Sequence, residues 1–215
     1  VLHANFYSVE FAQAMVMGIS VQAAANLTNT YFDFIKGVDN KDNAAAGTGE
    51  KTLVEQKIST HGLITLAIAL YIIALVSISP LLLRCWPTLV TFVCGTLLSM
   101  FYTATPIGLK YIALGDVTIF LCFGPLLMQC TSLILTGELN NELNIYSIPI
   151  GLLTEGILHA NNARDIKSDT LAGASTLATI IGFKNSYYLP PFYGNVFLND
   201  ERNERYLWTM EAVLG

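Results

Sequence analysis

The chain has 215 residues, of which 53% are hydrophobic and 13% are charged, and its formal net charge is −5. This charged fraction is about half that of an ordinary globular protein, and the mean hydropathy is +0.52. Together these values exclude a typical soluble domain and favour a lipid bilayer as the surroundings. The scattered basic residues give no indication of a nucleic-acid partner. The cysteines stand in apolar stretches without metal-ligand spacing, so we interpret them as packing residues and not as metal or disulfide partners.

Taken in chain order, five segments have the pattern of helices in a membrane bundle. They are 6–27, 62–80, 86–103, 117–136 and 144–160. The first is helical in pattern but includes Glu10 and two glutamines, so one face should turn inward. The next three are almost uncharged and long enough to approach or cross a hydrocarbon core of ~30 Å. The fifth is shorter and carries Glu155 and His159 near its end, whereas a later apolar stretch, 171–183, is too short to span.

Basic residues are distributed unequally between the loops that join these segments. Alternating crossings place all but one of the membrane-proximal basic residues on one face, and only Arg84 on the other, which is a positive-inside pattern. The residues on the first face are Lys36, Lys41, Lys51, Lys57, Lys110, Arg164 and Lys167. Loops 26–61, 104–116 and 161–170 should therefore lie on that same, cytoplasmic, face.

Two clusters of carboxylates and amides lie in these loops. In the first, Asn26, Asn29 and Asp33 fall at helical spacing on one face, and Asp39 follows a glycine that lets the chain turn back. The second cluster follows the fifth segment and has a similar composition. Its members are Asn161, Asn162, Arg164, Asp165 and Asp169.

Two interpretations of the clusters compete. In the first interpretation, Asn and Asp cap helices where the helices leave a membrane. This explains one such cluster, but it explains less well two clusters of similar composition on the same face. Alternatively, mutually repelling carboxylates are held close because a divalent cation lies between them. Hard oxygen ligands without Cys or His suit Mg²⁺, which bridges protein carboxylates to substrate phosphates. The sequence thus favours a Mg²⁺ site that binds a diphosphate.

A third polar segment, 102–116, lies on the same face. Lys110 and the hydroxyls of Tyr102 and Tyr111 stand beside a backbone loosened by Pro and Gly, and such groups can hold phosphate oxygens. A lysine at a helix end more often extends to the membrane surface without a specific partner. Because this segment lies opposite two acidic clusters, however, the phosphate interpretation is favoured.

These segments resemble the three signature segments of the UbiA superfamily of intramembrane prenyltransferases. The run 26–39, the Tyr-Thr-x-x-Pro-x-x-x-Lys stretch at 102–110 and the run 161–169 carry the resemblance, which covers about residues 12–183. Three short sequences between these segments narrow the resemblance to a menaquinone-forming subfamily. They are Lys-Thr-Leu-Val at 51–54, Phe-Gly-Pro at 123–125 and Thr-Glu-Gly-Ile-Leu-His at 154–159.

The resemblance implies an all-α, multi-span transmembrane bundle around a lateral cavity. It implies that four catalytic carboxylates, Asp33, Asp39, Asp165 and Asp169, bind Mg²⁺ as the metal ligands. The diphosphate contacts that it implies are Asn29, Tyr102, Lys110, Asn161, Asn162 and Arg164. One departure is that Glu50-Lys51 stands where the subfamily has Asp-Arg, which keeps the charges but loses the bidentate fork of arginine.

The reaction implied is transfer of an isoprenyl group, with geranylgeranyl diphosphate as donor, to a naphthoquinone-type acceptor in an endoplasmic reticulum, Golgi or mitochondrial membrane. Two alternatives stay open. One is a non-catalytic membrane partner of hydroxymethylglutaryl-CoA reductase in sterol-linked control. The other is a transporter, since intramembrane carboxylates also line ion paths. Glu155 and His159 are candidates for the base that removes the ring proton, or equally structural polar residues.

The resemblance ends near residue 183. We therefore divide the chain into an incomplete prenyltransferase domain, 1–183, and a polar tail, 184–215, whose Pro190–Pro191 pair cannot continue a helix. We expect the C-terminal helices of the fold to be missing. Because the cavity would then be open to water, we expect weak binding of Mg²⁺ and diphosphate without turnover.

Overall fold

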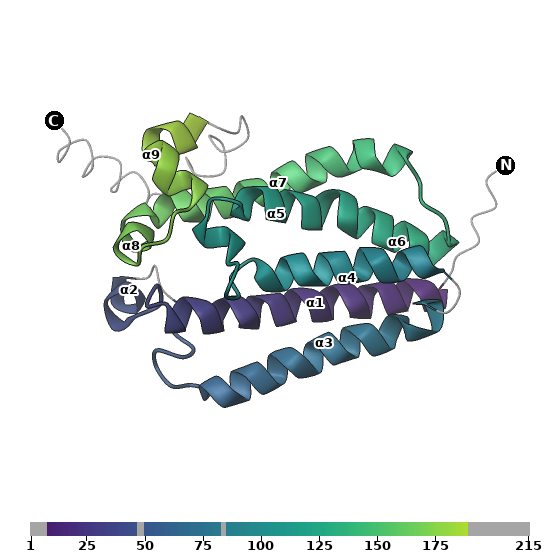
Figure 1. The fold of residues 1–215 in the computed structure, drawn as a ribbon, viewed down its shortest axis with the longest axis horizontal. Helices are drawn as coiled ribbons and strands as arrows, with labels where there is room; N and C mark the ends of the chain where they lie inside the picture. The colour runs from purple at the N-terminus through teal and green to yellow at the C-terminus, as the bar shows by residue number, and fades with distance from the viewer. Residues whose placement is uncertain (1–7, 47–49, 83–84, 189–215) are drawn as a thin grey trace.

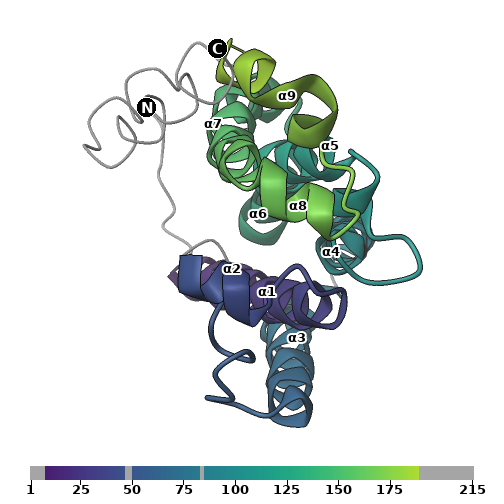
Figure 2. The ribbon, with the colours of Figure 1, turned by 90° about the vertical axis from the view of Figure 1, so that its left-hand side faces the viewer.

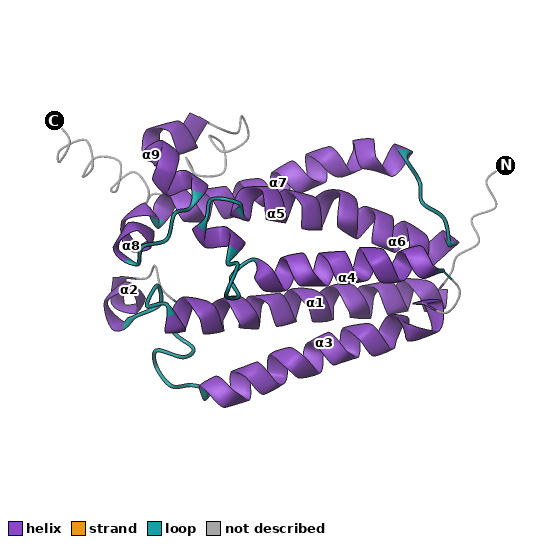
Figure 3. Ribbon diagram, viewed as in Figure 1, coloured by secondary structure: helices purple, strands orange, loops and turns teal. Residues whose placement is uncertain are grey.

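The computed structural model describes residues 8–46, 50–82 and 85–188, and the regular elements in these ranges are helices (Figures 1 and 3). The α-helices are α1 (Ser8–Ile35), α2 (Lys41–Ala46), α3 (Thr60–Leu82), α4 (Trp86–Phe101), α5 (Gly115–Leu121), α6 (Leu127–Thr136), α7 (Glu142–Arg164), α8 (Ile166–Leu171) and α9 (Leu177–Tyr188). A 3₁₀ turn, η1 (Leu109–Tyr111), precedes α5, and a π-helical turn, η2 (Cys122–Leu126), joins α5 to α6. The prediction of an all-α bundle is confirmed.

Two helical stretches of the described chain, Thr60–Leu81 and Gly115–Thr136, are long and apolar enough to cross a membrane. Helix α4 is also apolar but has only 16 residues. Only 22% of the first stretch is buried inside the protein. Its outward face carries large apolar side chains, Leu66, Ile68, Ile72, Ile73, Leu75 and Val76. A continuous apolar face of this size is stable in lipid and not in water.

Helix α1 extends eight residues beyond the segment predicted for it and ends at Ile35. The apolar pattern stops earlier, but polar side chains in the last turns bond back along the helix. The hydroxyl groups of Thr28 and Thr30 donate to the carbonyl oxygens of Ala24 and Asn26, at 2.8 and 3.0 Å. Asn26, Asn29 and Asp33 of the first cluster therefore lie within the helix and do not cap it, and Asp39 follows its end.

The helical run from α5 to α6 bends at Gly124, whose backbone leaves helical geometry, next to Pro125. Helix α7 packs against this bend at backbone distance. A Cβ atom on Gly151 of α7 would meet the ring and the carbonyl oxygen of Phe120 at 2.9 Å. Small residues at a helix contact allow this approach, as is common between membrane helices.

The buried core joins α1, α3, α4 and α6. Its members are Met17, Ala74, Ile78, Leu81, Phe92, Cys130 and Ile134. Helix α3 packs mainly on α1, and α5 to α9 stack on the other side of α1 and α4, as the end view in Figure 2 shows. Cys130 is thus a packing residue, as the sequence indicated.

The three polar loops lie at one end of the bundle, where α2, η1 and α8 gather (Figure 1). The end of α3, the start of α4 and the link from α6 to α7 lie at the opposite end. The prediction that these loops lie together is therefore confirmed, and their cytoplasmic side stays a prediction. Segment 171–183 contributes the last residue of α8, a turn and most of α9, which is broken at Gly182. Of the proposed tail, 184–188 belong to α9, and 189–215 lie outside the described residues.

Candidate metal and diphosphate site

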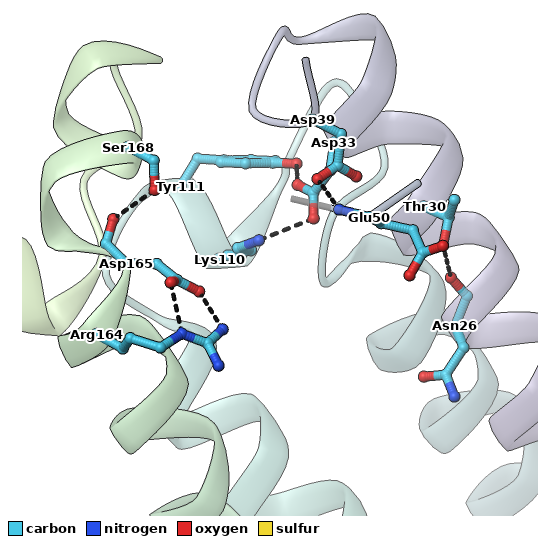
Figure 4. A network of polar contacts seen from close by, with 10 residues as sticks. All are labelled: Asn26, Thr30, Asp33, Asp39, Glu50, Lys110, Tyr111, Arg164, Asp165 and Ser168. Atoms are coloured by element: carbon cyan, nitrogen blue, oxygen red, sulfur yellow. Dashed lines mark hydrogen bonds and ion pairs between the residues drawn. The ribbon is translucent and has the colours of Figure 1, made fainter. Parts of the chain in front are cut away.

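A cavity of about 720 Å³ lies at the loop end of the bundle, between the ends of α1, α4 and α7, η1, α5 and α8. All ten residues singled out from the sequence line it: Asn29, Asp33, Asp39, Tyr102, Lys110, Asn161, Asn162, Arg164, Asp165 and Asp169. The two acidic clusters therefore face one space, although 122 residues or more separate them in the chain (39 to 161). Figure 4 shows polar contacts of five of these residues, Asp33, Asp39, Lys110, Arg164 and Asp165.

Asp33 is held by two groups that reach it from η1. Lys110 Nζ lies 2.9 Å from Asp33 Oδ2, and the Tyr111 hydroxyl donates to Asp33 Oδ1 at 2.5 Å. The ion pair is nearly buried, with 11% of the lysine side chain and 7% of the aspartate side chain exposed. Burial and the negative charge of Asp33 raise the pKa of Tyr111, so its hydroxyl stays a neutral donor.

In the second cluster, Arg164 and Asp165 form a bidentate pair. Arg164 Nε and Nη2 donate to the two carboxylate oxygens, each at 2.7 Å. The arginine side chain is half exposed, with 51% accessible, whereas 18% of the aspartate side chain is accessible. An exposed guanidinium can exchange partners at small cost, so Arg164 is free to turn toward an anion in the cavity.

Asp39 and Asp169 are two carboxyl groups of the cavity whose pKa the surroundings raise. Burial raises the pKa of Asp39 to about 6, although the backbone N–H of Glu50, at 2.8 Å from Oδ1, opposes this shift. Burial also raises the pKa of Asp169 to about 6, against the positive charge of Lys110. Desolvation disfavours their charged forms, and a cation in the cavity would favour them.

Several polar atoms of the cavity are buried without a hydrogen-bond partner among the described residues. They are Asn29 Oδ1, Tyr102 OH, Asn162 Nδ2 and Asp169 Oδ2. Buried polar atoms are normally paired, so these atoms indicate a ligand that would satisfy them. The oxygens among them, with the four carboxylates, are the hard donors that Mg²⁺ prefers. The residues present therefore fit a Mg²⁺–diphosphate ligand.

A smaller, largely apolar cavity of about 170 Å³ adjoins the acidic one between α1, α4 and the α5–α6 run. The two share Gln22, Ser99, Cys122 and Phe123 in their walls. Apolar side chains such as Met17, Phe92 and Leu126 line the smaller cavity farther from the acidic clusters. An amphiphilic ligand can thus place an anionic head among the carboxylates and an apolar tail along the bundle.

Glu155 and His159 do not line either cavity. His159 is fully buried, and its Nδ1 atom lies 2.5 Å from Oδ1 of Asp116 at the start of α5. With Glu155 they form a group whose potential ligand atoms lie within 4.8 Å of one another. The pair joins α5 to α7, so the structure favours the structural interpretation of these residues over a role as ring base.

Two contacts at the site were not foreseen from the sequence. Tyr111 was seen as a potential phosphate ligand, but its hydroxyl contacts Asp33. Glu50 lines the cavity and donates its backbone N–H to Asp39, whereas Lys51 is exposed and does not line it. The Asp33–Tyr111 contact joins residues 78 positions apart, so no local sequence signal indicates it.

The fold and this site define an integral membrane helical bundle with an acidic cavity at one membrane face and an apolar cavity beside it. The model of the UbiA prenyltransferase family matches residues 2–198 of the chain. The chain belongs to this family, whose members are membrane helical bundles.

Curated relatives support the assignment. The protein named UbiA prenyltransferase domain-containing protein 1 from Dictyostelium discoideum is 37% identical over 201 residues, which are 90% of this chain and 59% of the relative. Its namesake from Gallus gallus is 40% identical over 177 residues, 80% of this chain and 51% of the relative. The protein of the same name from Homo sapiens is 38% identical over 177 residues, which are 80% of this chain and 50% of the relative. The chain spans about half the length of the curated relatives it matches.

Proposed function

We propose that this chain forms the donor-binding part of an aromatic prenyltransferase. Its donor would be a prenyl diphosphate, geranylgeranyl diphosphate by the family resemblance, and its acceptor a reduced naphthoquinone in an endoplasmic reticulum, Golgi or mitochondrial membrane. The observation that carries the proposal is the single cavity that gathers both acidic clusters and Lys110 and adjoins an apolar cavity.

Asp33, Asp39, Asp165 and Asp169 are the residues that would hold Mg²⁺. When bound, Mg²⁺ supplies positive charge to the diphosphate and makes it a better leaving group. The unpartnered side chains of Asn29, Asn162 and Tyr102 would contact the diphosphate oxygens, together with Asn161. They lie on the cavity wall beside the carboxylates and have hydrogen-bonding capacity to spare.

Lys110 and Arg164 would supply the cationic contacts to the diphosphate. Both are paired with carboxylates that would otherwise bind metal, at 2.9 and 2.7 Å. With a cation held by the carboxylates, Lys110 and Arg164 would be available to contact the anion. This exchange of partners keeps every charge in the cavity paired, which matters because unpaired buried charge is costly.

The proposed reaction breaks the bond between the allylic carbon and the diphosphate oxygen, and the electron pair leaves with the diphosphate. A ring carbon of the acceptor then forms a bond to the allylic carbon. That ring carbon loses its proton, for which the released diphosphate is a sufficient acceptor. The apolar walls keep water from the allylic cation, which would otherwise be hydrolysed.

The prenyl tail would extend into the apolar cavity between α1 and α4. Gly18 and Gly95 line this cavity, and a Cβ atom on either would meet no atom within 4 Å. Open space beside two helices is what a flexible chain of isoprene units needs. The apolar cavity therefore supports a long prenyl donor over a soluble diphosphate.

The test is an assay of the purified chain in nanodiscs with geranylgeranyl diphosphate and a reduced naphthoquinone, with and without Mg²⁺. The proposal expects Mg²⁺-dependent donor binding, and prenylated product in a protein of the relatives' full length. Asp33→Ala and Asp165→Ala should abolish both. Asp42→Ala, an exposed carboxylate on the same membrane face that does not line the cavity, is the matched control.

Loss of binding in the control, or full binding in both site variants, would contradict the proposal. The alternative role, a non-catalytic partner of hydroxymethylglutaryl-CoA reductase, expects the reductase to co-purify with the chain while donor binding is absent. A transporter would instead move an ion across the nanodisc or vesicle membrane without product. The three outcomes are distinct.

A further inference from the structure

The Tyr111 side chain points to the carboxylate of Asp33, one of the four proposed metal ligands. Its hydroxyl donates to Asp33 Oδ1 at 2.5 Å, while Lys110 takes the other oxygen (Figure 4). Tyr111 does not itself line the acidic cavity. It therefore holds Asp33, which lines the cavity, from a position outside the cavity wall.

The backbone of Tyr111 connects this contact to the second acidic cluster. Its carbonyl oxygen accepts a hydrogen bond from the backbone N–H of Ser175 at 3.2 Å. The preceding residue, Ala174, donates to the carbonyl oxygen of Asp169 at 2.8 Å. Through its side chain and backbone together, Tyr111 thus spans the distance between the two clusters.

The ring of Tyr111 is fixed by two further contacts. Lys36 Nζ lies 3.5 Å from the ring centroid, in cation–π geometry. Gly108, with φ of +56°, allows the ring and the lysine to approach, since a Cβ there would meet Tyr111 Cδ2 at 2.8 Å and Lys36 Nζ at 3.1 Å. A cation over the ring also withdraws electron density, which makes the phenol a better donor.

A purely structural interpretation is that Tyr111 packs a loop. Packing alone does not explain a hydroxyl placed on a nearly buried carboxylate that is also held by Lys110. If Lys110 moves to a phosphate, Tyr111 is the contact among the described hydrogen bonds that continues to orient Asp33. Groups that orient metal ligands in this way typically change metal affinity roughly 10- to 100-fold when removed.

We propose that Tyr111 is a positioning residue that orients Asp33 for cation binding and sets the distance between the two acidic clusters. This inference rests on the proposed function, because it takes Asp33 as a metal ligand. Lys36 and Gly108 act through Tyr111: the first polarises and holds the ring, and the second leaves room for it.

The test measures Mn²⁺ binding to the purified chain by electron paramagnetic resonance, with inorganic pyrophosphate as the anion. Tyr111→Phe keeps the ring and removes the hydroxyl, and we expect Mn²⁺ to bind roughly 10-fold more weakly. The unfolding temperature should change little. Tyr146→Phe, on the exposed face of α7, is the control and should bind Mn²⁺ as the native chain does.

A second variant displaces the same ring without removing its hydroxyl. Gly108→Ala should weaken Mn²⁺ binding in the same direction. Gly137→Ala imposes the same left-handed strain, at φ of +78°, but meets nothing within 4 Å, so it controls for strain alone. If the strain explained the effect, both alanine variants would lose metal affinity equally.

Native Mn²⁺ affinity in Tyr111→Phe overturns the positioning role and leaves the proposed function intact. Weaker pyrophosphate binding by Tyr111→Phe in the absence of metal would make Tyr111 a phosphate ligand, which also overturns it. If the native chain and Asp33→Ala both fail to bind Mn²⁺ with pyrophosphate, the proposed function itself fails.

Discussion

Asp39 and Asp169 belong to different acidic clusters but share one electrostatic property. Each is buried, and burial raises the pKa of each carboxyl group to about 6. In the unfolded chain such groups titrate near 3.9. Between pH 6 and pH 4 the metal-free folded state therefore binds more protons than the unfolded state, and its stability rises as the pH falls. Cation binding should instead become stronger as the pH rises, because it requires the charged carboxylates.

A first prediction follows for the effect of ligand on thermal stability. Mg²⁺ with pyrophosphate should raise the unfolding temperature more at pH 7.5 than at pH 5, because protons compete for Asp39 and Asp169 at the lower pH. Differential scanning fluorimetry in detergent measures the shift. In the Asp39→Asn, Asp169→Asn double variant the metal-free stability should lose this part of its pH dependence. Equal shifts at both pH values would contradict the burial argument.

Lys110 carries a second prediction. Lys110→Ala should weaken pyrophosphate binding in the presence of Mg²⁺ by roughly 10-fold or more, since a charge-assisted hydrogen bond is lost. Binding of Mg²⁺ alone should not weaken, because the lysine competes with the cation for Asp33. Isothermal titration calorimetry separates the two. Lys57→Ala, which removes an exposed ion pair with Glu55, is the control. Unchanged pyrophosphate affinity would refute the phosphate role of Lys110.

At the scale of elements, α1 and α4 form the walls that would hold the prenyl tail. Gly18 and Gly95 leave open space in the apolar cavity between these helices. Glycine is unfavourable within a helix by comparison with alanine. Its presence at two facing walls is explained if a ligand occupies the space.

Filling that space should change the preference for donor length. Gly95→Leu should weaken binding of geranylgeranyl diphosphate more than binding of geranyl diphosphate, because the shorter tail does not reach as far along the bundle. Competition against a labelled donor gives the ratio. Ala69→Leu, on the exposed face of α3, is the control. An equal loss for both donors would show that the cavity does not hold the tail.

The helices themselves show which parts of the structure are encoded locally. Long apolar runs predicted α3, α4 and the α5–α6 run, because burial in lipid requires apolar side chains and internal hydrogen bonding. The continuation of α1 to Ile35 was missed, since its last turns carry polar residues that face a cavity. The kink at Gly124 lies beside Pro125, a local signal for a bend, whereas the close approach of α7 to it is a long-range contact that no local pattern reveals.

The candidate site, like the helices, was predicted from the sequence in part. The spacing of Asn29 and Asp33 and the charge of the loops indicated a shared acidic face, and the structure brings these residues together. The roles assigned to them stay predictions. The contact of the Tyr111 hydroxyl with Asp33 was not foreseen, because Asp33 lies 78 residues earlier in the chain. Contacts of that kind depend on how helices pack and not on neighbouring residues.

In the whole molecule, the acidic cavity depends on two groups of helices. The first cluster comes with α1, which packs against α3, and the second comes with α7 and α8 (Figures 1 and 2). The η1 segment lies between them and contacts both, through Lys110 and Tyr111 on one side and the Ser175 hydrogen bond on the other. A ligand that needs both clusters would therefore bind only when the two groups are held together.

The central claim is that both acidic clusters bind one Mg²⁺–prenyl diphosphate ligand. Equilibrium binding of labelled geranylgeranyl diphosphate to the chain in nanodiscs tests it most directly, with Asp33→Asn and Asp165→Asn as variants from the two clusters and Asp42→Asn as control. The account predicts saturable binding that requires Mg²⁺, falls at least roughly 10-fold in each site variant and persists in the control. Binding that is independent of Mg²⁺, or that depends on only one of the clusters, would contradict it.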